Sequence, residues 1–288
     1  MLLEGRHAII TGANRGLGSH IARHFVQAGA DVLICGRNAE LVEKTVSGLQ
    51  AGTSRKVIGV AADVSSEKDA DRIMRTAGKE FPCVDILVNC AGICGPVGPL
   101  ETLDWKEWKK ALDINVAGTV LMCMRVLPQM KERHCGKIIN ISGGGATKPL
   151  PHLSAYAASK AGAVRFTETL ALEVKKFSID VNAIAPGVLN TGLVDEFIRA
   201  GVENLGEDYF REVERQKNSG EDSFARASAL AVYLASQKSD GITGRLISAI
   251  WDPWENLQDH AEDIASSDIY TIRRITPADR GKTWGERK

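Results

Sequence analysis

The sequence lacks several features that mark particular classes of protein. It has no excess of either charge, because 36 lysines and arginines balance 36 aspartates and glutamates. This balance creates no overall field that would draw nucleic acid or an anionic membrane to the surface. The six cysteines form no CxxC pair. Their scatter through mostly apolar segments predicts buried, reduced thiols, with no disulfide framework and no metal site.

No stretch of the chain has the pattern of a signal peptide or of a membrane-spanning segment. Residues 1–6 carry a glutamate before any apolar stretch, which is untypical of a signal peptide. We find no apolar run that approaches the roughly 20 residues needed to cross a bilayer. With 44% hydrophobic residues, the chain has enough apolar side chains for a large core. These features predict a soluble, cytoplasmic protein that acts without a membrane.

What the sequence does contain is a regular alternation of short β-branched runs with longer amphipathic segments. Continuous apolar runs are typical of strands buried on both faces of a parallel sheet. We expect strands at residues 7–10, 31–35, 56–60, 85–89, 137–141 and 180–184, and a last one from residue 244. We expect helices at residues 17–28, 38–50, 66–80, 104–130 and 154–177.

This alternation predicts right-handed crossovers between parallel strands. The expected fold class is α/β: a doubly wound (Rossmann-type), mostly parallel, seven-stranded sheet with helices on both faces. We expect one domain over residues 1–250. Within it, the charged helical residues 190–220 are expected to form a lid over a substrate site, or else an ordinary pair of surface helices. Residues 251–288 hold three of the five tryptophans and are expected to pack on the domain or on a neighbouring subunit.

A glycine-rich turn lies directly after the first expected strand and opens the first expected helix. Its glycines let the backbone approach a pyrophosphate closely, and the helix N-terminus offers unpaired N–H groups to that charge. The first strand–helix junction of a parallel sheet is the place where such a turn binds a dinucleotide. The alternative is a tight turn without a ligand. The expected cofactor contacts in this turn are Thr11, Gly12, Asn14, Arg15, Gly16, Leu17 and Gly18.

The end of the second strand indicates which dinucleotide is bound. An acidic residue there would accept a hydrogen bond from the 2′-hydroxyl of the adenosine ribose. The strand ends instead in Cys35, Gly36 and Arg37. Arg37, joined by Arg15, would pair with a 2′-phosphate, unless both arginines are simply solvated. The sequence therefore predicts NADP in preference to NAD.

Tyr156 and Lys160 stand four residues apart in an expected helix, so both side chains project from one face. A phenol has an ordinary pKa of about 10, which makes it a poor proton donor or acceptor near neutral pH. A nearby ammonium favours the phenolate and lowers that pKa. The pair therefore predicts a general acid/base, provided that it faces the dinucleotide site. Alone, this spacing is more often an ordinary exposed helix.

Taken together, these motifs resemble the single-domain branch of the short-chain dehydrogenase/reductase family. The resemblance covers residues from about 5 to about 250 in the expected order. The extended branch, with many epimerases and dehydratases, spaces its glycines differently. The matching positions are 11–18, Asp63, the segment Asn89-Cys-Ala-Gly92, Asn115, Ser142, Tyr156 with Lys160, Pro186-Gly187, and Thr191.

The resemblance implies a role for each matching residue in a dinucleotide-binding catalytic domain. Tyr156 would transfer the proton, and Lys160 would contact the nicotinamide ribose and lower the pKa of Tyr156. Ser142 would hydrogen-bond the substrate oxygen, and Asn115 would help to hold a water in a proton relay. The implied cofactor contacts outside the glycine turn are Asp63, Val64, Asn89, Ala91, Gly92, Pro186, Gly187, Val188 and Thr191.

Three features depart from the family pattern. The family more often places its serine one residue later, where this chain has Gly143, so Ser142 acts only if the loop to Tyr156 carries one extra residue. Cys90 stands at the second position of the asparagine segment, where a small buried thiol is harmless. After the last strand, two tryptophans and a long tail follow where most relatives end.

The leading interpretation is NADP-dependent interconversion of a carbonyl and an alcohol by hydride transfer. A dinucleotide-binding regulator without turnover is a second possibility, because of the serine register. A dehydratase or epimerase that uses its cofactor transiently is a third. The resemblance also implies a homodimer or homotetramer, paired through the helices near residues 104–130 and 154–177. The substrate is a small molecule whose identity no motif reveals.

Overall fold

The computed structural model describes residues 1–187, 189, 192–217 and 222–284. Its centre is a seven-stranded sheet in which every neighbouring pair of strands is parallel, in the order β3-β2-β1-β4-β5-β6-β7. The doubly wound sheet expected from the sequence is therefore confirmed. The strands are β1 (His7–Thr11), β2 (Asp31–Gly36), β3 (Val57–Ala61), β4 (Ile86–Asn89), β5 (Gly136–Ile141), β6 (Ile179–Ala185) and β7 (Leu246–Ser248).

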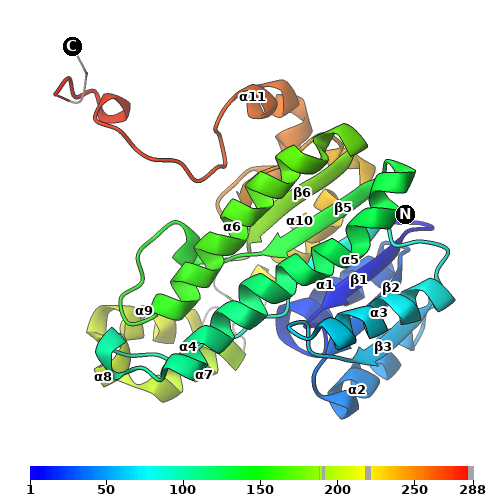
Figure 1. Cartoon of the computed structure of the whole chain (residues 1–288), viewed down its shortest axis with the longest axis horizontal. Helices are drawn as coiled ribbons and strands as arrows, with labels where there is room; N and C mark the ends of the chain where they lie inside the picture. The colour runs from blue at the N-terminus through cyan, green and yellow to red at the C-terminus, as the bar shows by residue number, and fades with distance from the viewer. Residues whose placement is uncertain (188, 190–191, 218–221, 285–288) are drawn as a thin grey trace.

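Helices cover both faces of this sheet (Figure 1). The first face packs against α1 (Gly16–Gln27), α2 (Ala39–Gln50) and α10 (Asp222–Ala235). The second face packs against α3 (Glu67–Glu80), α5 (Gly118–Arg133) and α6 (Ser154–Val174). Successive strand residues serve the two layers in turn, so that Ile10 lies in the first core and Ile9 in the second, both fully buried. This double burial explains why the strands read as continuous apolar runs.

The long helix expected at residues 104–130 forms, and a π-helical turn lies within it. It consists of α4 (Trp105–Leu112), a π-helical turn η2 (Asp113–Ala117) and α5. Together they give a continuous helix of 29 residues, with a mean hydropathy of 1.3 in its most apolar stretch. It is therefore longer and more apolar than the runs expected from the sequence. Met122, Val126 and Met130 are fully buried against the sheet, and core helices of soluble proteins meet the same length and hydropathy criterion.

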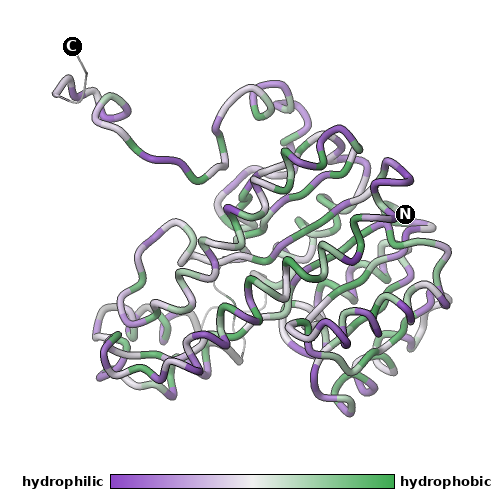
Figure 2. The backbone as a smooth tube through the Cα atoms, in the orientation of Figure 1, coloured by the Kyte–Doolittle hydropathy of each residue, from purple (hydrophilic) through white to green (hydrophobic). Residues whose placement is uncertain are grey.

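The expected lid region forms three short helices beside the carboxyl ends of the strands. They are α7 (Gly192–Ala200), α8 (Val202–Leu205) and α9 (Glu207–Lys217). Val194, Phe197 and Val213 of these helices share a small apolar cluster with Cys94 and Leu153. Figure 2 shows helices that alternate between hydrophobic and hydrophilic residues along their course, as amphipathic surface helices do. The lid region thus packs on the segments that follow β4 and precede α6.

The first part of the C-terminal extension packs on this domain. Trp254 and Leu257, in η6 (Trp254–His260), and Ile264, in α11 (Ala261–Ser266), join the apolar core beneath α1 and α10. The buried guanidinium of Arg245 donates to carbonyls of the extension, including that of Ile269 at 2.8 Å. Residues 273–284 run away from the domain as an arm that includes η7 (Ala278–Arg280) (Figure 1).

The extension also covers the outer edge of the sheet. The backbone N–H of Leu246, in β7, donates to the carbonyl of Tyr270 at 2.8 Å. The backbone N–H of Ile272 donates to the carboxylate of Glu168, on α6, at 2.6 Å. The last strand is only three residues long, shorter than the apolar run from 244 suggested, because the chain turns into η6 soon after it.

Candidate active site

A cavity of about 920 Å³ opens at the carboxyl ends of the central strands. It lies where the chain leaves β1 towards one face of the sheet and β4 towards the other, the position at which doubly wound folds bind ligands. Its volume lies in the range of pockets that hold small molecules and cofactors. The cavity therefore is the first candidate for an active site.

Most of the residues expected to form the site line this cavity. Thr11, Asn89 and Asn115 lie beneath its wall and are buried. Val188 and Thr191 lie outside the described residues, so their expected contacts stay predictions. The lining residues among those expected are Gly12, Asn14, Arg15, Gly16, Leu17, Gly18, Arg37, Asp63, Val64, Ala91, Gly92, Ser142, Tyr156, Lys160, Pro186 and Gly187.

The glycine turn has the close backbone packing that a phosphate-binding turn needs. Gly12 has a φ of +64°, and a Cβ atom at this position would lie 2.6 Å from the Cα atom of Ala91. A Cβ atom on Gly18 would lie 2.5 Å from the carbonyl oxygen of Gly12. Side chains at either position would force the turn away from the strand ends. Thr11 fixes the neighbouring loop, since its hydroxyl accepts hydrogen bonds from the N–H groups of Cys90 and Ala91 at 3.0 and 3.1 Å.

The N-terminus of α1 is open towards the cavity. Its N-cap residue, Arg15, makes no side-chain capping hydrogen bond among the described residues, and the first turn carries no acid. A 12-residue helix has enough aligned peptide dipoles to attract an anion at this end. The free N–H groups and the dipole together favour a phosphate group at the cavity wall.

Arg37, directly after β2, and Arg15, in the glycine turn after β1, border the cavity, and the end of β2 carries no acid. Arg15 and Arg37 are exposed, both line the cavity, and neither forms an ion pair within the described part of the chain. Gly36 has no room for a carboxylate, because a Cβ atom there would lie 2.5 Å from Oδ1 of Asn14. Asp63, at the same end of the cavity, accepts hydrogen bonds from the backbone N–H and the hydroxyl of Ser65 at 2.9 and 2.6 Å.

Tyr156 and Lys160 lie on α6, as the sequence indicates, and both face the cavity. The Nζ atom of Lys160 lies 5.6 Å from the centre of the Tyr156 ring. It donates a hydrogen bond to the carbonyl of Ile141, at the end of β5, at 3.0 Å. Gly92 lies close by, since a Cβ atom on it would be 3.7 Å from this Nζ atom. The amino group thus lies between the loops that follow β4 and β5.

The proton affinities of this pair differ from the expectation. Burial raises the pKa of Tyr156 above its ordinary value. Burial also lowers the pKa of Lys160 from 10.5 to about 8. Both shifts have the same cause, because leaving bulk water disfavours the charged form of each group. The expected lowering of the Tyr156 pKa by Lys160 is therefore not found.

The serine expected to contact the substrate points elsewhere. Ser142 is buried, and its hydroxyl donates to the backbone carbonyl of Lys160 at 3.5 Å. Gly143 is the residue next to the tyrosine hydroxyl, since a Cβ atom on it would lie 2.6 Å from Oη of Tyr156. The loop before Tyr156 therefore does not bring the Ser142 side chain to the family's usual serine position. Its direct contact with substrate stays a prediction that this geometry does not support.

Asn115 acts as a clamp beneath the cavity. It lies in the π-helical turn η2, whose altered hydrogen bonding directs the side chain towards the loop after β4. Its Oδ1 atom accepts from the N–H of Ile93, and its Nδ2 atom donates to the Ile93 carbonyl, both at 2.9 Å. The Nδ2 atom also donates to Ser159 on α6, again at 2.9 Å. Ser159 is a positioning residue that sequence reasoning missed, although it lies three residues after Tyr156.

Asn89 belongs to a second buried network. Its Nδ2 atom donates to Asn140 of β5 at 2.9 Å, and Asn140 in turn donates to the hydroxyl of Thr167 on α6 at 2.8 Å. The network ties the two central strands to the helix that carries Tyr156. Asn89 thus supports the site from below without lining it, and its expected contact with the cofactor stays a prediction.

The outer half of the cavity is formed by residues that the sequence did not reveal. Phe197, from the lid region, meets the Tyr156 ring edge-on with ring centres 6.3 Å apart, and it contacts Tyr209 in the same way at 6.0 Å. Their helical spacing predicts a buried face but gives no sign of what that face contacts. The other cavity-lining residues on this side include Thr147, Lys148, Leu150, Val194, Glu196, Leu246, Ser248, Trp251 and Asp252.

The six cysteines are all free, as expected for reduced thiols. Cys90 and Cys94 lie next to the site, and burial raises the pKa of each thiol to about 12. A thiol with such a pKa is almost wholly protonated at neutral pH, so neither is a ready nucleophile.

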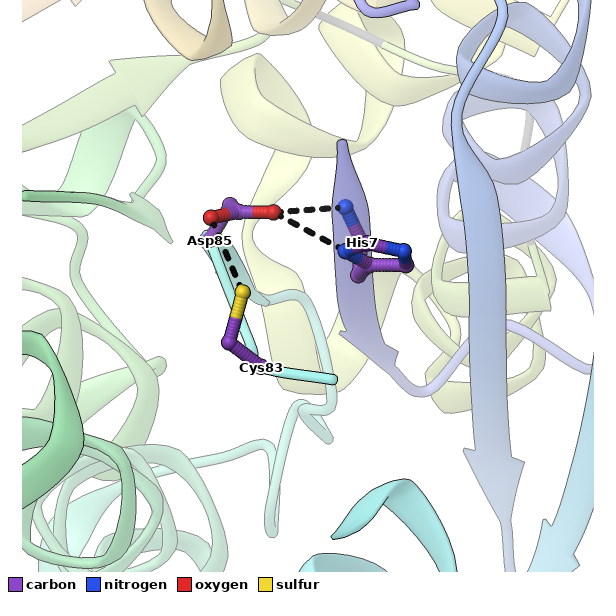
Figure 3. Close-up of side chains that lie close together, drawn as sticks. All are labelled: His7, Cys83 and Asp85. Carbon is purple, nitrogen blue, oxygen red and sulfur yellow. Dashed lines mark hydrogen bonds and ion pairs between the residues drawn. The ribbon is translucent and has the colours of Figure 1, made fainter. Parts of the chain in front are cut away.

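A separate polar cluster lies at the opposite, amino end of the sheet (Figure 3). Ligand atoms of His7, Cys83 and Asp85 lie within 4.8 Å of one another, as in a metal site. These atoms are already engaged: Asp85 accepts from His7 at 3.1 Å, and Arg133 donates to Asp85 at 2.9 Å and to Cys83 at 3.1 Å. Burial opposes ionisation of Asp85, but the hydrogen bonds from Arg133 and His7 outweigh it and hold the pKa below its ordinary value. The cluster ties β1, β4 and α5 together.

A glycine turn and a tyrosine–lysine pair that face one cavity define a class of protein, the dinucleotide-dependent oxidoreductases of α/β fold. The family model described as "short chain dehydrogenase" matches residues 6–200. The chain is 31% identical to "Dehydrogenase/reductase SDR family member 4" of Sus scrofa, over 85% of this chain and 86% of that protein. It is 34% identical to "3beta-hydroxysteroid dehydrogenase 1" of Eggerthella lenta, over 84% of this chain and 91% of that protein.

A solved structure agrees with these sequence relatives. The crystal structure of 3-ketoacyl-(acyl-carrier-protein) reductase from Brucella melitensis, complexed with NADH, matches with a TM-score of 0.74 at 31% identity. The match covers 85% of this chain and 97% of that one. The chain therefore belongs to the short-chain dehydrogenase/reductase family, whose members are oxidoreductases that act on hydroxyl and carbonyl groups with a nicotinamide dinucleotide.

Proposed function

We propose that the protein reduces a carbonyl compound to an alcohol with NADPH, or catalyses the reverse reaction. One observation carries the proposal: Tyr156 and Lys160 line the same cavity as the glycine turn at the end of β1. The residues fit a nicotinamide dinucleotide, because the turn has no room for side chains at Gly12 and Gly18 and α1 directs an uncapped N-terminus at the cavity. When bound, the cofactor supplies or accepts the hydride.

In this proposal Tyr156 transfers the proton. Its hydroxyl lies in the cavity beside Gly143 and donates to the substrate oxygen as the carbonyl is reduced. The phenolate left behind is stabilised by the ammonium of Lys160, which is held by the Ile141 carbonyl on the same side of the helix. Phe197 and Tyr209 keep water from this side of the ring. Asn115 holds the loop at Ile93 against α6, which fixes the cavity wall.

The preference for NADPH rests on charge at the end of β2. Arg37 and Arg15 provide two guanidinium groups that would pair with a 2′-phosphate. The space at Gly36 is taken by the Asn14 side chain, so no acid there competes for a ribose hydroxyl. The related reductase from Brucella melitensis was solved with NADH, so cofactor choice needs to be measured on this chain.

We also propose a cytoplasmic homodimer or homotetramer. The free cysteines suit a reducing compartment. The outer faces of α5 and α6 carry large apolar side chains in water, since Met124 is 58% and Leu172 is 77% exposed. Pairing of these helices between subunits would cover both side chains. Light scattering coupled to size exclusion gives the oligomeric state directly.

The activity is tested with purified protein, NADPH and a panel of carbonyl compounds: ketoacyl thioesters, keto sugars, steroids and small ketones. We expect loss of NADPH absorbance with at least one of these classes. Tight NADPH binding without turnover on any of them would support a dinucleotide-binding regulator instead. Product formation without a net change in cofactor absorbance would support a dehydratase or epimerase.

A further inference from the structure

The residue beside the Tyr156 hydroxyl is a glycine, and this changes how the substrate oxygen is held. A Cβ atom on Gly143 would lie 2.6 Å from Oη of Tyr156, closer than real Cβ contacts allow. The hydroxyl therefore occupies space that any side chain at position 143 would fill. Ser142, one residue earlier, directs its own hydroxyl to the backbone of Lys160. The hydroxyl of Ser142 is thus already engaged with the protein backbone.

The same loop contains backbone N–H groups that are not used in hydrogen bonds within the described part of the chain. The N–H of Ser142 donates to the Ile184 carbonyl at 2.8 Å, and the N–H of Ala146 turns back to the Gly143 carbonyl at 3.0 Å. Between them, the N–H groups of Gly143, Gly144 and Gly145 have no hydrogen-bond partner in the part of the chain that is described. Gly143 is buried, and a buried N–H group without a partner is rare because it costs free energy.

Two of these three glycines line the cavity. Gly143 and Gly144 belong to its wall, whereas Gly145 packs behind them against Ala157 and Leu150. Without side chains, glycines leave their N–H groups open to a ligand, and successive free amides in such a loop form a concave site for a negatively charged atom. The cavity wall next to the Tyr156 hydroxyl therefore offers backbone donors in place of a side-chain hydroxyl.

We propose that the backbone N–H groups of Gly143 and Gly144 hold the substrate oxygen together with the hydroxyl of Tyr156. The inference rests on the proposed carbonyl reduction. As the carbonyl carbon accepts a hydride, the π electrons of the C=O bond move onto oxygen, which then takes the proton of Tyr156. Fixed donors aimed at this oxygen stabilise the charge as it develops, and one such donor contributes about 10²–10³ to kcat.

The experiment removes one N–H group at a time from the full-length enzyme. Incorporation of glycolic acid in place of a glycine turns the amide into an ester and deletes only that donor. Esters at positions 143 and 144 should each lower kcat by about 10²–10³-fold while NADPH affinity stays the same. The matched control is the ester at position 145, whose N–H is equally unpaired but lies outside the cavity wall.

Two side-chain variants test the competing arrangement. Ser142→Ala should lose only a few fold in kcat, from looser packing under Lys160; a loss of a hundredfold or more would make Ser142 the donor. Gly143→Ser should lower kcat, because its Cβ atom displaces the Tyr156 hydroxyl. A rise in kcat would show that the site lacks a donor which serine restores. NADPH affinity and the thermal midpoint report whether each variant folds.

The outcomes separate this inference from the proposed function. If the unmodified enzyme turns over a carbonyl and the esters at 143 and 144 leave kcat unchanged, this inference is wrong and the proposed function stands. If the unmodified enzyme reduces no carbonyl, the proposed function is wrong and the inference falls with it.

Discussion

The Nζ atom of Lys160 lies 5.6 Å from the centre of the Tyr156 ring and donates a hydrogen bond to the Ile141 carbonyl at 3.0 Å. The two side chains are one helical turn apart on α6, and both line the cavity. The lysine is therefore held in place by the sheet, independently of the tyrosine. This arrangement leaves the phenol free to face a substrate while the amino group stays at its side.

Tyr156→Phe removes only the hydroxyl that we assign to proton transfer. We expect kcat to fall by about 10²–10⁴-fold, the usual contribution of a general acid or base, with NADPH affinity unchanged. Tyr270→Phe is the matched control, since that tyrosine belongs to the extension and lies outside the cavity wall. Undiminished turnover in Tyr156→Phe would refute the assignment.

The depressed pKa of Lys160 predicts a loss of activity in mildly alkaline solution. Burial lowers this pKa to about 8, so the side chain carries its charge below that pH and loses it above. A neutral amine stabilises the Tyr156 phenolate less, so kcat/KM for NADPH should decline as the pH rises past about 8. The pH profile of kcat/KM is the measurement, because it reports ionisations of the free enzyme. A flat alkaline profile would contradict the role given to Lys160.

Arg37→Ala should weaken the binding of NADPH and leave that of NADH nearly unchanged. A hydrogen bond to a charged group contributes about 1.5–3 kcal/mol, so we expect the affinity for NADPH to fall by about 10–100-fold. Arg75→Ala, on the exposed side of α3, changes the net charge equally without touching the cavity and serves as the control. Isothermal titration of each variant with both cofactors gives the comparison. Equal affinities of the native chain for NADPH and NADH would rule out the 2′-phosphate argument.

Asn115→Ala tests the clamp beneath the cavity. It removes the hydrogen bonds to Ile93 and Ser159 and leaves buried polar groups unpaired. We expect the free energy of unfolding to fall by about 1–3 kcal/mol and kcat to fall with it. Urea denaturation with and without NADPH measures the first effect. An unchanged denaturation midpoint would mean that the loop at Ile93 does not depend on the clamp.

Arg245→Met tests how the extension is attached. The guanidinium of Arg245 is buried and donates to the carbonyls of Ile264, Ser267 and Ile269. Its loss should lower the free energy of unfolding by about 1.5–3 kcal/mol and increase hydrogen exchange in residues 254–272. Arg280→Met, in the exposed arm, is the control for the loss of charge. Unchanged exchange would show that the apolar contacts alone hold the extension.

Much of the fold could be predicted, because a strand that is buried on both faces of the sheet needs apolar residues at successive positions. Such strands therefore appear in the sequence as continuous apolar runs. Ile9 and Ile10 serve opposite cores, so neither position tolerates a polar residue. The π-helical turn at Asn115 could not be predicted, because a local shift in backbone hydrogen bonding leaves no periodic trace in the sequence.

The parts of the candidate site that require glycine, because the backbone packs too tightly for a side chain, could be predicted from the sequence. The parts that depend on the path of a loop could not. Gly12 and Gly18 had to be glycines in a turn this tight. Spacing alone did not decide whether Ser142 or Gly143 meets Tyr156, because the answer depends on the path of the loop between β5 and α6. The positions of Phe197 and Tyr209 depend on how the lid helices pack, which no local pattern fixes.

The backbone hydrogen bond from the N–H of Leu246 to the carbonyl of Tyr270 has a practical consequence for any shortened form of this protein. A chain cut after residue 250 would leave the β7 side of the sheet open to pairing with other chains, and would bare the apolar surface now under Trp254 and Leu257. Such a fragment should therefore aggregate. Enzyme assays and crystallisation therefore need the intact C-terminal segment, even though the catalytic chemistry lies elsewhere.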